Sequence, residues 1–252
     1  LCRRGGMRPF AVLYLKEFKD NLNTIALLWV ATFAIGLCAI SQQAEVGIVV
    51  SILAASPYMG VLILPFLLAQ SFASEIKAQT NYQLLALPVS RWQVGLSKVA
   101  VVVTAGSGIW LLTTGAIHWL AIGFDESDLT FLQGSKLQGI DIWVLSGLGY
   151  HAFALLLLGI ACVIEGAKQC MKKRRKLLSL GVFIACFWVY FKFTGELSID
   201  LGNLGVYSLE SEFFHSDEPT KAKIAGLLYT AVMGIGFIAI GLGLYDRFAE
   251  VD

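Results

Sequence analysis

The sequence carries little charge for its length. Lys, Arg, Asp and Glu make up 15% of its 252 residues, whereas a typical soluble domain carries about 25%. Hydrophobic residues make up 57% of the chain, and the mean hydropathy is +0.71. A water-soluble globule of this size cannot bury so much apolar surface, because a large share of any folded surface still faces the solvent. We therefore expect lipid to be part of the solvent.

Several other features are missing. The net charge of +1 provides neither the basic field that nucleic acid requires nor an acidic field for cations, so no nucleic-acid partner is expected. The five cysteines show no paired spacing, which argues against a disulfide framework or a zinc site. The sequence has no phosphate-binding loop, zinc-protease motif or nucleophile elbow. We expect the chain to be no enzyme by itself and to bind no cofactor or metal.

Long hydrophobic runs, in contrast, are abundant. A helix that crosses a bilayer needs about 20 apolar residues. Six runs meet this requirement, at about 24–41, 48–71, 97–123, 143–165, 177–194 and 224–245. They leave no polar stretch long enough for a soluble domain. The sequence predicts an all-α, polytopic membrane protein in which residues 1–252 form one transmembrane domain, and residues 1–6, which precede Met7, are assigned no function.

The distribution of Lys and Arg predicts the orientation, because short loops rich in these residues stay on the cytoplasmic side. Basic residues gather before the first run, after the second run and after the fourth, where residues 172–176 are all basic. The alternate loops are mainly acidic. We therefore expect both termini to be cytoplasmic in a multi-pass membrane protein.

Two local patterns modify this layout. Between residues 8 and 22, apolar side chains recur at helical spacing, namely Ala11, Tyr14, Leu15, Phe18 and Leu22. This stripe is typical of an amphipathic helix in the membrane interface, and the alternative is that the segment extends the first span into water. Pro57 and Pro65 each remove a backbone donor from the second run, so a kinked or interrupted helix is expected there.

The centres of the six runs carry no Asp, Glu, Lys or Arg. Carriers coupled to protons or sodium ions normally place such groups inside the membrane, so this class is disfavoured. His118 and His151 fall within runs, and we interpret each as an interfacial or inter-helix hydrogen-bonding residue, with a ligand or relay role as the alternative. Small residues, at 105–108 and at Gly234, Gly236, Gly241 and Gly243, are predicted to be helix-packing surfaces.

The loop between the second and third runs, residues 74–98, has the most specific pattern. Glu75 ends the second span, and Tyr82, Leu84, Leu85 and Leu87 then form an apolar ridge. Pro88 stops this segment, and Ser90 is placed to cap the following helix. An apolar ridge that faces the cytoplasm indicates a protein partner.

This loop resembles the corresponding loop in permeases of the ABC-2 type of ATP-binding-cassette transporter. The family pattern is a Glu, a Thr five residues later, Leu-Leu, Pro-Val/Ile-Ser-Arg and a Gly-Lys about ten residues after the proline. The matching positions here are Glu75, Thr80, Leu84, Leu85, Pro88, Val89, Ser90, Arg91 and Lys98. Gln79 and Ser97 depart from the pattern, since the family usually has Gly at both places. The amino-terminal helix, the six spans and the cytoplasmic termini also suit this family.

The resemblance implies that the loop docks on a separate ATPase subunit. That partner would bind ATP and Mg, and two permease copies, identical or related, would move between inward- and outward-facing states in the lipid bilayer. The residues implied for contact or loop shape are Glu75, Thr80, Leu84, Leu85, Pro88, Ser90 and Arg91. The chain is thus expected to be the permease subunit of an exporter. A secondary carrier or channel without an ATPase partner is the alternative from another class.

The substrate is constrained only loosely. By resemblance, the second and fifth spans line the pathway at the dimer axis, and the polar groups of the second span are Ser51, Ser56, Tyr58 and Gln70. A mainly apolar pathway favours a lipid, a hydrophobic drug or a peptide antibiotic, although the same residues would also suit packing between two copies. In the loop at 195–223 the resemblance implies short re-entrant or interfacial helices that close the outer end.

The predicted topology can be tested by cysteine labelling in a background without the five native cysteines. A cysteine that replaces Ser211 should react with an impermeant maleimide in intact cells, because its loop is predicted to lie outside. A cysteine that replaces Ala78 should react only after permeabilisation. The reverse pattern would overturn the predicted orientation.

Overall fold

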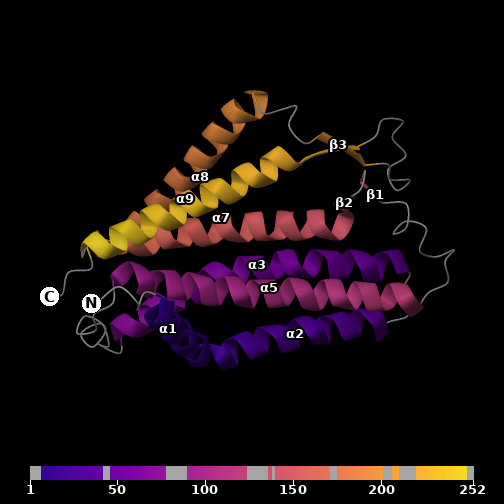
Figure 1. Cartoon of the computed structure of the whole chain (residues 1–252), viewed down its shortest axis with the longest axis horizontal. Helices are drawn as coiled ribbons and strands as arrows, with labels where there is room; N and C mark the ends of the chain where they lie inside the picture. Colours follow the sequence, from indigo (N-terminus) through magenta and orange to yellow (C-terminus); the bar gives the residue numbers. More distant parts are fainter. Residues whose placement is uncertain are drawn as a thin grey trace.

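The computed structural model describes residues 7–248 apart from 42–45, 78–89, 124–135, 138–139, 171–174, 201–205 and 210–219. Helices make up most of this part of the chain (Figure 1). They are α1 (Met7–Asp20), α2 (Leu22–Ser41), α3 (Val46–Lys77), α5 (Arg91–Gly123), α7 (Ile142–Cys170), α8 (Arg175–Asp200) and α9 (Ile224–Phe248).

The prediction of a polytopic helical membrane protein agrees with the lengths and compositions of these helices. Five of the described helices are long and apolar enough to cross a membrane. The consecutive helices α1 and α2 form a sixth candidate, bent by 61° between them. This bend separates the amino-terminal helix from the first predicted span, as expected for a segment with its own orientation. The start of α1 and the end of α9 lie at the same end of the bundle (Figure 1).

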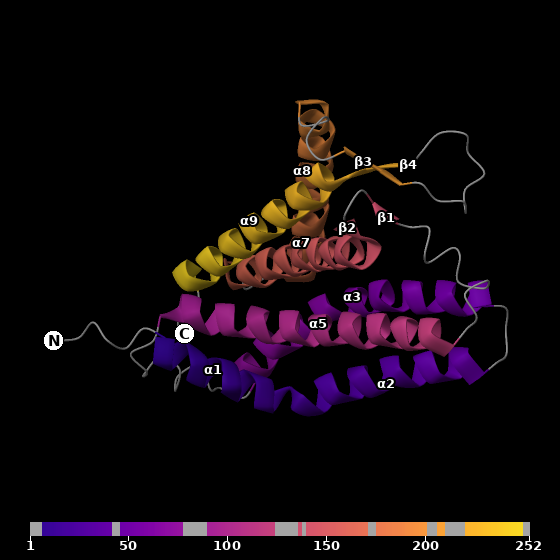
Figure 2. The same cartoon turned by 45° about the vertical axis from the view of Figure 1, so that its right-hand side comes forward.

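The helices form two layers. In Figure 2, α1 and α2 lie along one side of α3 and α5, and we treat these four helices as one layer; α7 and α9 lie together on the other side, and α8 projects away from both layers. The layers meet in an apolar core where Val61, Leu64 and Leu68 of α3 pack against Tyr150 and Leu158 of α7. All five side chains are at most 1% exposed. This core holds α3 and α5 against α7.

Glycine brings the backbones of α7 and α9 into direct contact. A Cβ at Gly159 or Gly166 of α7 would collide with the carbonyl oxygen of Gly234 or Gly241 of α9, respectively. The four residues form two facing pairs, each pair separated from the next by seven positions along its helix. Small residues permit this close approach, which is how helices associate where lipid supplies no hydrophobic driving force. The predicted packing role is confirmed for Gly234 and Gly241, whereas Gly236 and Gly243 face open space.

Two expectations for the helices need correction. Of the two expected effects of the prolines, a kink or an interruption, the interruption does not occur, since α3 continues as one helix through both residues. Pro65 frees the carbonyl group of Val61, and Val61 is 0% exposed within the core, so protein covers the break as a bilayer requires. On α1, Tyr14 and Phe18 of the predicted apolar stripe are half-buried while Leu15 is 63% exposed, so the stripe is divided between protein and surroundings.

Four short strands lie in the described parts of the connections. The pair β1 (Lys136–Leu137) and β2 (Ile140–Asp141) is antiparallel, as is the pair β3 (Val206–Leu209) and β4 (Thr220–Lys223). In β3 and β4, Val206 pairs with Lys223. The expectation of an all-α chain is therefore correct for the candidate spans but not for these connections. The expectation of short helices in 195–223 is wrong for residues 206–209 and 220–223, which form β3 and β4. Val206 and Tyr207 favour the extended backbone.

The glycine contact between α7 and α9 is testable by adding a side chain. A Cβ at Gly234 would lie 2.5 Å from the backbone carbon of Leu155, whereas one at Gly236 meets nothing within 4 Å. Gly234→Leu should destabilise the protein by at least about 1–3 kcal/mol, because overpacking against backbone cannot relax. Gly236→Leu is the matched control and should stay near the wild type. Thermal unfolding in detergent measures both, and equal behaviour of the two variants would contradict the assigned contact.

Candidate functional site

A buried ion pair joins α1 to α5. The Lys98 Nζ lies 2.9 Å from the Oε2 of Glu17. Lys98 is 1% exposed and Glu17 is 4% exposed. Both groups are therefore removed from the surroundings and must be satisfied by each other and by neighbouring polar atoms.

Ser71 of α3 completes this site. Its hydroxyl lies 3.1 Å from the Glu17 Oε2 and donates to it, while the Lys98 Nζ donates to the same hydroxyl at 3.1 Å. The Lys98 Nζ also lies 3.4 Å from the carbonyl oxygen of Ser71, and it stands 5.7 Å from the ring centroid of Phe72. We call Glu17, Ser71 and Lys98 the Lys98 cluster. It connects three helices through one ammonium group.

The local sequence explains why these residues meet. On α1, Leu13, Tyr14, Glu17 and Phe18 are the positions turned to the bundle, at the i, i+3 and i+4 spacing of one helix face. Tyr14 also forms a 2.9 Å hydrogen bond with the Thr104 hydroxyl of α5. The face of α1 that carries Glu17 is therefore held against α5 by apolar packing and by the hydrogen bond of Tyr14.

Further contacts hold the neighbouring end of α5 against α9. The Arg91 Nη1 donates to the carbonyl oxygen of Asp246 at 3.2 Å. Ser90 is the N-cap residue, since its carbonyl oxygen accepts from the backbone N–H of Gln93 at 2.9 Å. The Phe72 and Tyr245 rings also pack at 5.2 Å between centroids. The ends of α3 and α5 that flank residues 78–89 are thus held from two sides.

The structure places only part of the predicted partner-binding set. Arg91 and Ser90 lie at the start of α5, as described, and Ser90 takes the predicted capping position. Glu75 lies in the last turn of α3, and its side chain is outside the description. The remaining residues also lie outside the described residues, namely Thr80, Leu84, Leu85 and Pro88. The predicted loop 74–98 is shorter than expected, because α3 continues to Lys77 and α5 begins at Arg91.

The predicted pathway residues do not converge on one site in the described part of the chain. Ser56 is half-buried, Gln70 is exposed and the side chain of Ser51 is outside the description. Tyr58 is 43% exposed, and its ring meets the edge of Tyr150 with 6.3 Å between centroids. Through this ring contact Tyr58 is joined to the buried core that Tyr150 belongs to.

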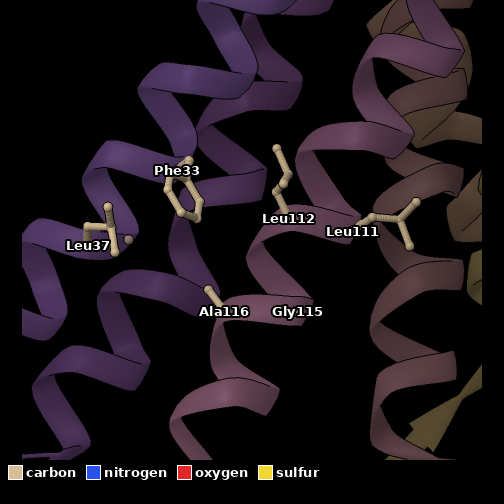
Figure 3. Close-up of a pocket in the computed structure, with 7 residues that line it drawn as sticks. Phe33, Leu37, Leu111, Leu112, Gly115 and Ala116 are labelled. Carbon is tan, nitrogen blue, oxygen red and sulfur yellow. The ribbon is translucent and has the colours of Figure 1, made fainter.

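An apolar groove lies between α2 and α5. Its volume is about 280 Å³. It is lined by Phe33, Gly36, Leu37, Leu111, Leu112, Gly115 and Ala116. Figure 3 shows Phe33 and Leu37 approaching from α2 and Leu112 and Ala116 from α5, with the missing side chain of Gly115 leaving space between them. The groove has a surface suited to hydrocarbon.

Sequence reasoning missed Glu17. Lys98 was assigned to the family pattern, but nothing local to Glu17 identifies a partner 81 residues away. A signal does exist, because Glu17 is the only acid between Met7 and Lys19 in a strongly basic segment and shares a helix face with Leu13 and Phe18. A lone acid on an apolar face predicts a buried cation partner.

Substitution of one partner tests whether the Lys98 cluster is a coupled unit. Lys98→Met leaves the Glu17 carboxylate buried without its cation, which should cost about 3–5 kcal/mol of stability. The double variant Glu17→Gln with Lys98→Met removes both charges and should recover most of that loss. Thermal unfolding of the three proteins in the same detergent measures the coupling. Additive losses in the double variant would show that the two side chains do not act together.

Comparison with known proteins gives no relative from which to transfer a role to this site. No family model matches the chain, and neither a curated protein nor a solved structure matches it significantly.

Proposed function

We propose that the chain is the transmembrane permease subunit of an ABC-2 type exporter, working with a separate ATPase in the plasma membrane of a prokaryote. The observation that carries the proposal is the loop pattern between α3 and α5, read together with the way both flanking helices are held. Lys98, a member of the pattern, is the residue that binds α1, α3 and α5 together. A partner that moves the loop would therefore move three helices at once.

The proposed mechanism follows from this connection. The ATPase subunit binds ATP and Mg and hydrolyses the nucleotide, while the loop of this chain follows its motion. The Lys98 cluster passes the displacement from α3 and α5 to α1. Breaking a buried ion pair is costly, so these helix ends shift as a unit, and the pathway between two permease copies changes its opening.

A second permease copy is part of the proposal. Only 6% of the span Leu177–Thr194 in α8 is buried, compared with 61% of Ser146–Cys170 in α7. Figure 2 shows α8 projecting from the two layers. It exposes large side chains, including Phe183, Ile184, Trp188 and Phe191. A second copy, identical or related, would cover this face at the dimer axis.

The proposed substrate is hydrophobic or amphiphilic, such as a lipid, a drug or a peptide antibiotic. The groove between α2 and α5 is almost entirely apolar, and the exposed residues of α3 include Met59, Leu62 and Phe66. Such surfaces provide no binding groups for a free ion or a sugar.

The second candidate function is a secondary carrier or channel without an ATPase. One observation favours it more than the sequence did. Lys98 and Glu17 bring charges into buried positions, and His151 lies inside the span Ser146–Cys170. Ionisable groups within spans are typical of coupled carriers. Lys98, Glu17 and His151 all form hydrogen bonds within the protein, which also suits a purely structural role. The exporter therefore remains the first proposal.

Purification of the tagged chain from its native cell in mild detergent separates the two functions. The exporter predicts a nucleotide-binding subunit in near-stoichiometric amount and ATP hydrolysis by the complex. A chain that purifies alone and transports in liposomes without ATP would support the carrier and overturn the exporter.

Leu85→Asp tests the docking role of the loop. Burial of a carboxylate in an apolar groove of the ATPase is costly, so the variant should insert normally but lose most of the copurified ATPase. Leu85→Met is the matched control, because it keeps volume and apolar character and should retain the partner. Undiminished complex formation by the Asp variant would exclude Leu85 from the contact.

A further inference from the structure

His151 of α7 is hydrogen-bonded through both ring nitrogens. Its Nδ1 lies 2.7 Å from the carbonyl oxygen of Gly147, and its Nε2 lies 3.0 Å from the hydroxyl oxygen of Ser107 on α5. Ser107 in turn donates to the carbonyl oxygen of Val103 at 2.9 Å. Both helices are candidate spans at these positions. The expected inter-helix hydrogen-bonding role of His151 is thus confirmed, whereas the side chain of His118 lies outside the described residues.

The three hydrogen bonds of His151 and Ser107 need more protons than a neutral imidazole and one hydroxyl can supply. A carbonyl oxygen only accepts, so Nδ1 must carry a proton toward Gly147. The Ser107 hydroxyl has one proton. If it donates to Val103, then Nε2 must also carry a proton, and the ring is an imidazolium. If the ring is neutral, the hydroxyl must turn to Nε2 and release Val103. The three contacts are satisfied together only when His151 is protonated.

We propose that His151 is a proton-binding site within the membrane, and that its protonation strengthens the contact between α5 and α7. The proton adds to Nε2, which changes from acceptor to donor. The Ser107 hydroxyl then rotates from Nε2 to the Val103 carbonyl oxygen, and no other atom is exchanged. Hydrogen bonds from a charged donor are roughly twice as strong as neutral ones, so the protonated ring holds Ser107 more firmly.

Aromatic and polar groups surround the imidazole ring of His151, and none of its described contacts is charged. From α5, Trp110 meets the ring with 5.8 Å between centroids. From its own helix, Tyr150 lies at 5.2 Å and donates its hydroxyl proton to the Gly106 carbonyl oxygen. From α3, Tyr58 reaches this group through Tyr150. No carboxylate and no second cation is among the contacts that the structure describes for the ring.

The position of the site gives the proton a structural consequence. α5 belongs to one layer of the bundle and α7 to the other (Figure 2). The hydrogen bond between Ser107 and His151 is therefore a link between layers, beside the bond that Tyr150 donates to Gly106. Protonation would favour the arrangement in which the layers are closed at this point. The inference depends on this chain alone and holds for either proposed function.

Trp110 provides a direct probe, because an imidazolium beside an indole quenches its fluorescence. The purified full chain in lipid nanodiscs is titrated from pH 8 to pH 5, the range in which an ordinary imidazole gains its charge. The wild type should lose emission in one step. That step should vanish in His151→Gln, and also in Trp110→Phe, which removes the probe while the other five of the six tryptophans remain.

The chain offers a matched control in its two other histidines. The double variant His118→Gln with His215→Gln should keep the step. Ser107→Ala should change the midpoint of this step, because it removes the hydrogen-bond partner of Nε2; a merely structural serine would leave the midpoint unchanged. Absence of a step in the wild type, or its persistence in His151→Gln, would overturn the proposal. If His151→Gln does not fold, the Trp110 and Ser107 variants decide the outcome.

Discussion

The ion pair between Lys98 and Glu17 fixes the position of the first helix, and through it the end of the bundle from which the loop between α3 and α5 extends. A charge buried in protein has no water to satisfy it, so an ammonium at 1% exposure demands a carboxylate and further acceptors within the protein. Ser71 accepts a further hydrogen bond from Lys98 and so joins α3 to the cluster. The consequence is geometrical, because separation of α1, α3 and α5 at this point breaks a buried ion pair, which is costly.

The α7–α9 and α5–α7 interfaces depend on different kinds of contact. The glycine pairs of α7 and α9 set backbone against backbone, and a close-packed interface of this kind does not deform continuously. The contacts between α5 and α7 instead depend on side-chain hydrogen bonds, from His151 and from Tyr150. These can be exchanged or redirected at small cost. We therefore expect α7 and α9 to move together. The apolar core of α3 and α7 holds the two layers against each other, so the hydrogen bonds between α5 and α7 are the contacts across the layers that can change locally.

Much of the fold was predictable because hydropathy is a local property. The six apolar runs coincide with α2, α3, α5, α7, α8 and α9, since backbone groups in lipid must be satisfied within the helix. The contacts of the candidate site were harder to predict from the sequence. Glu17 and Lys98 are distant in sequence, and only the folded arrangement brings them together. Glycine identity predicted a packing surface, but not that Gly234 would face α7 while Gly236 would face outward. The continuity of α3 through Pro65 likewise depends on neighbours that cover the freed carbonyl group.

The helix α5 is where the proposed inputs meet. At its beginning, the Lys98 cluster connects it to α1 and α3, next to the loop on which the proposed ATPase would act. Further along the same helix, Ser107 connects it to a proton on His151. Because one helix carries both contacts, displacement at its start and protonation at its middle act on the same equilibrium between layers. Each input can therefore change the effect of the other, by the reciprocity that holds for two sites coupled through one conformational change. A proton at His151 would oppose any ATPase-driven step that separates α5 from α7 and assist the step that brings them back.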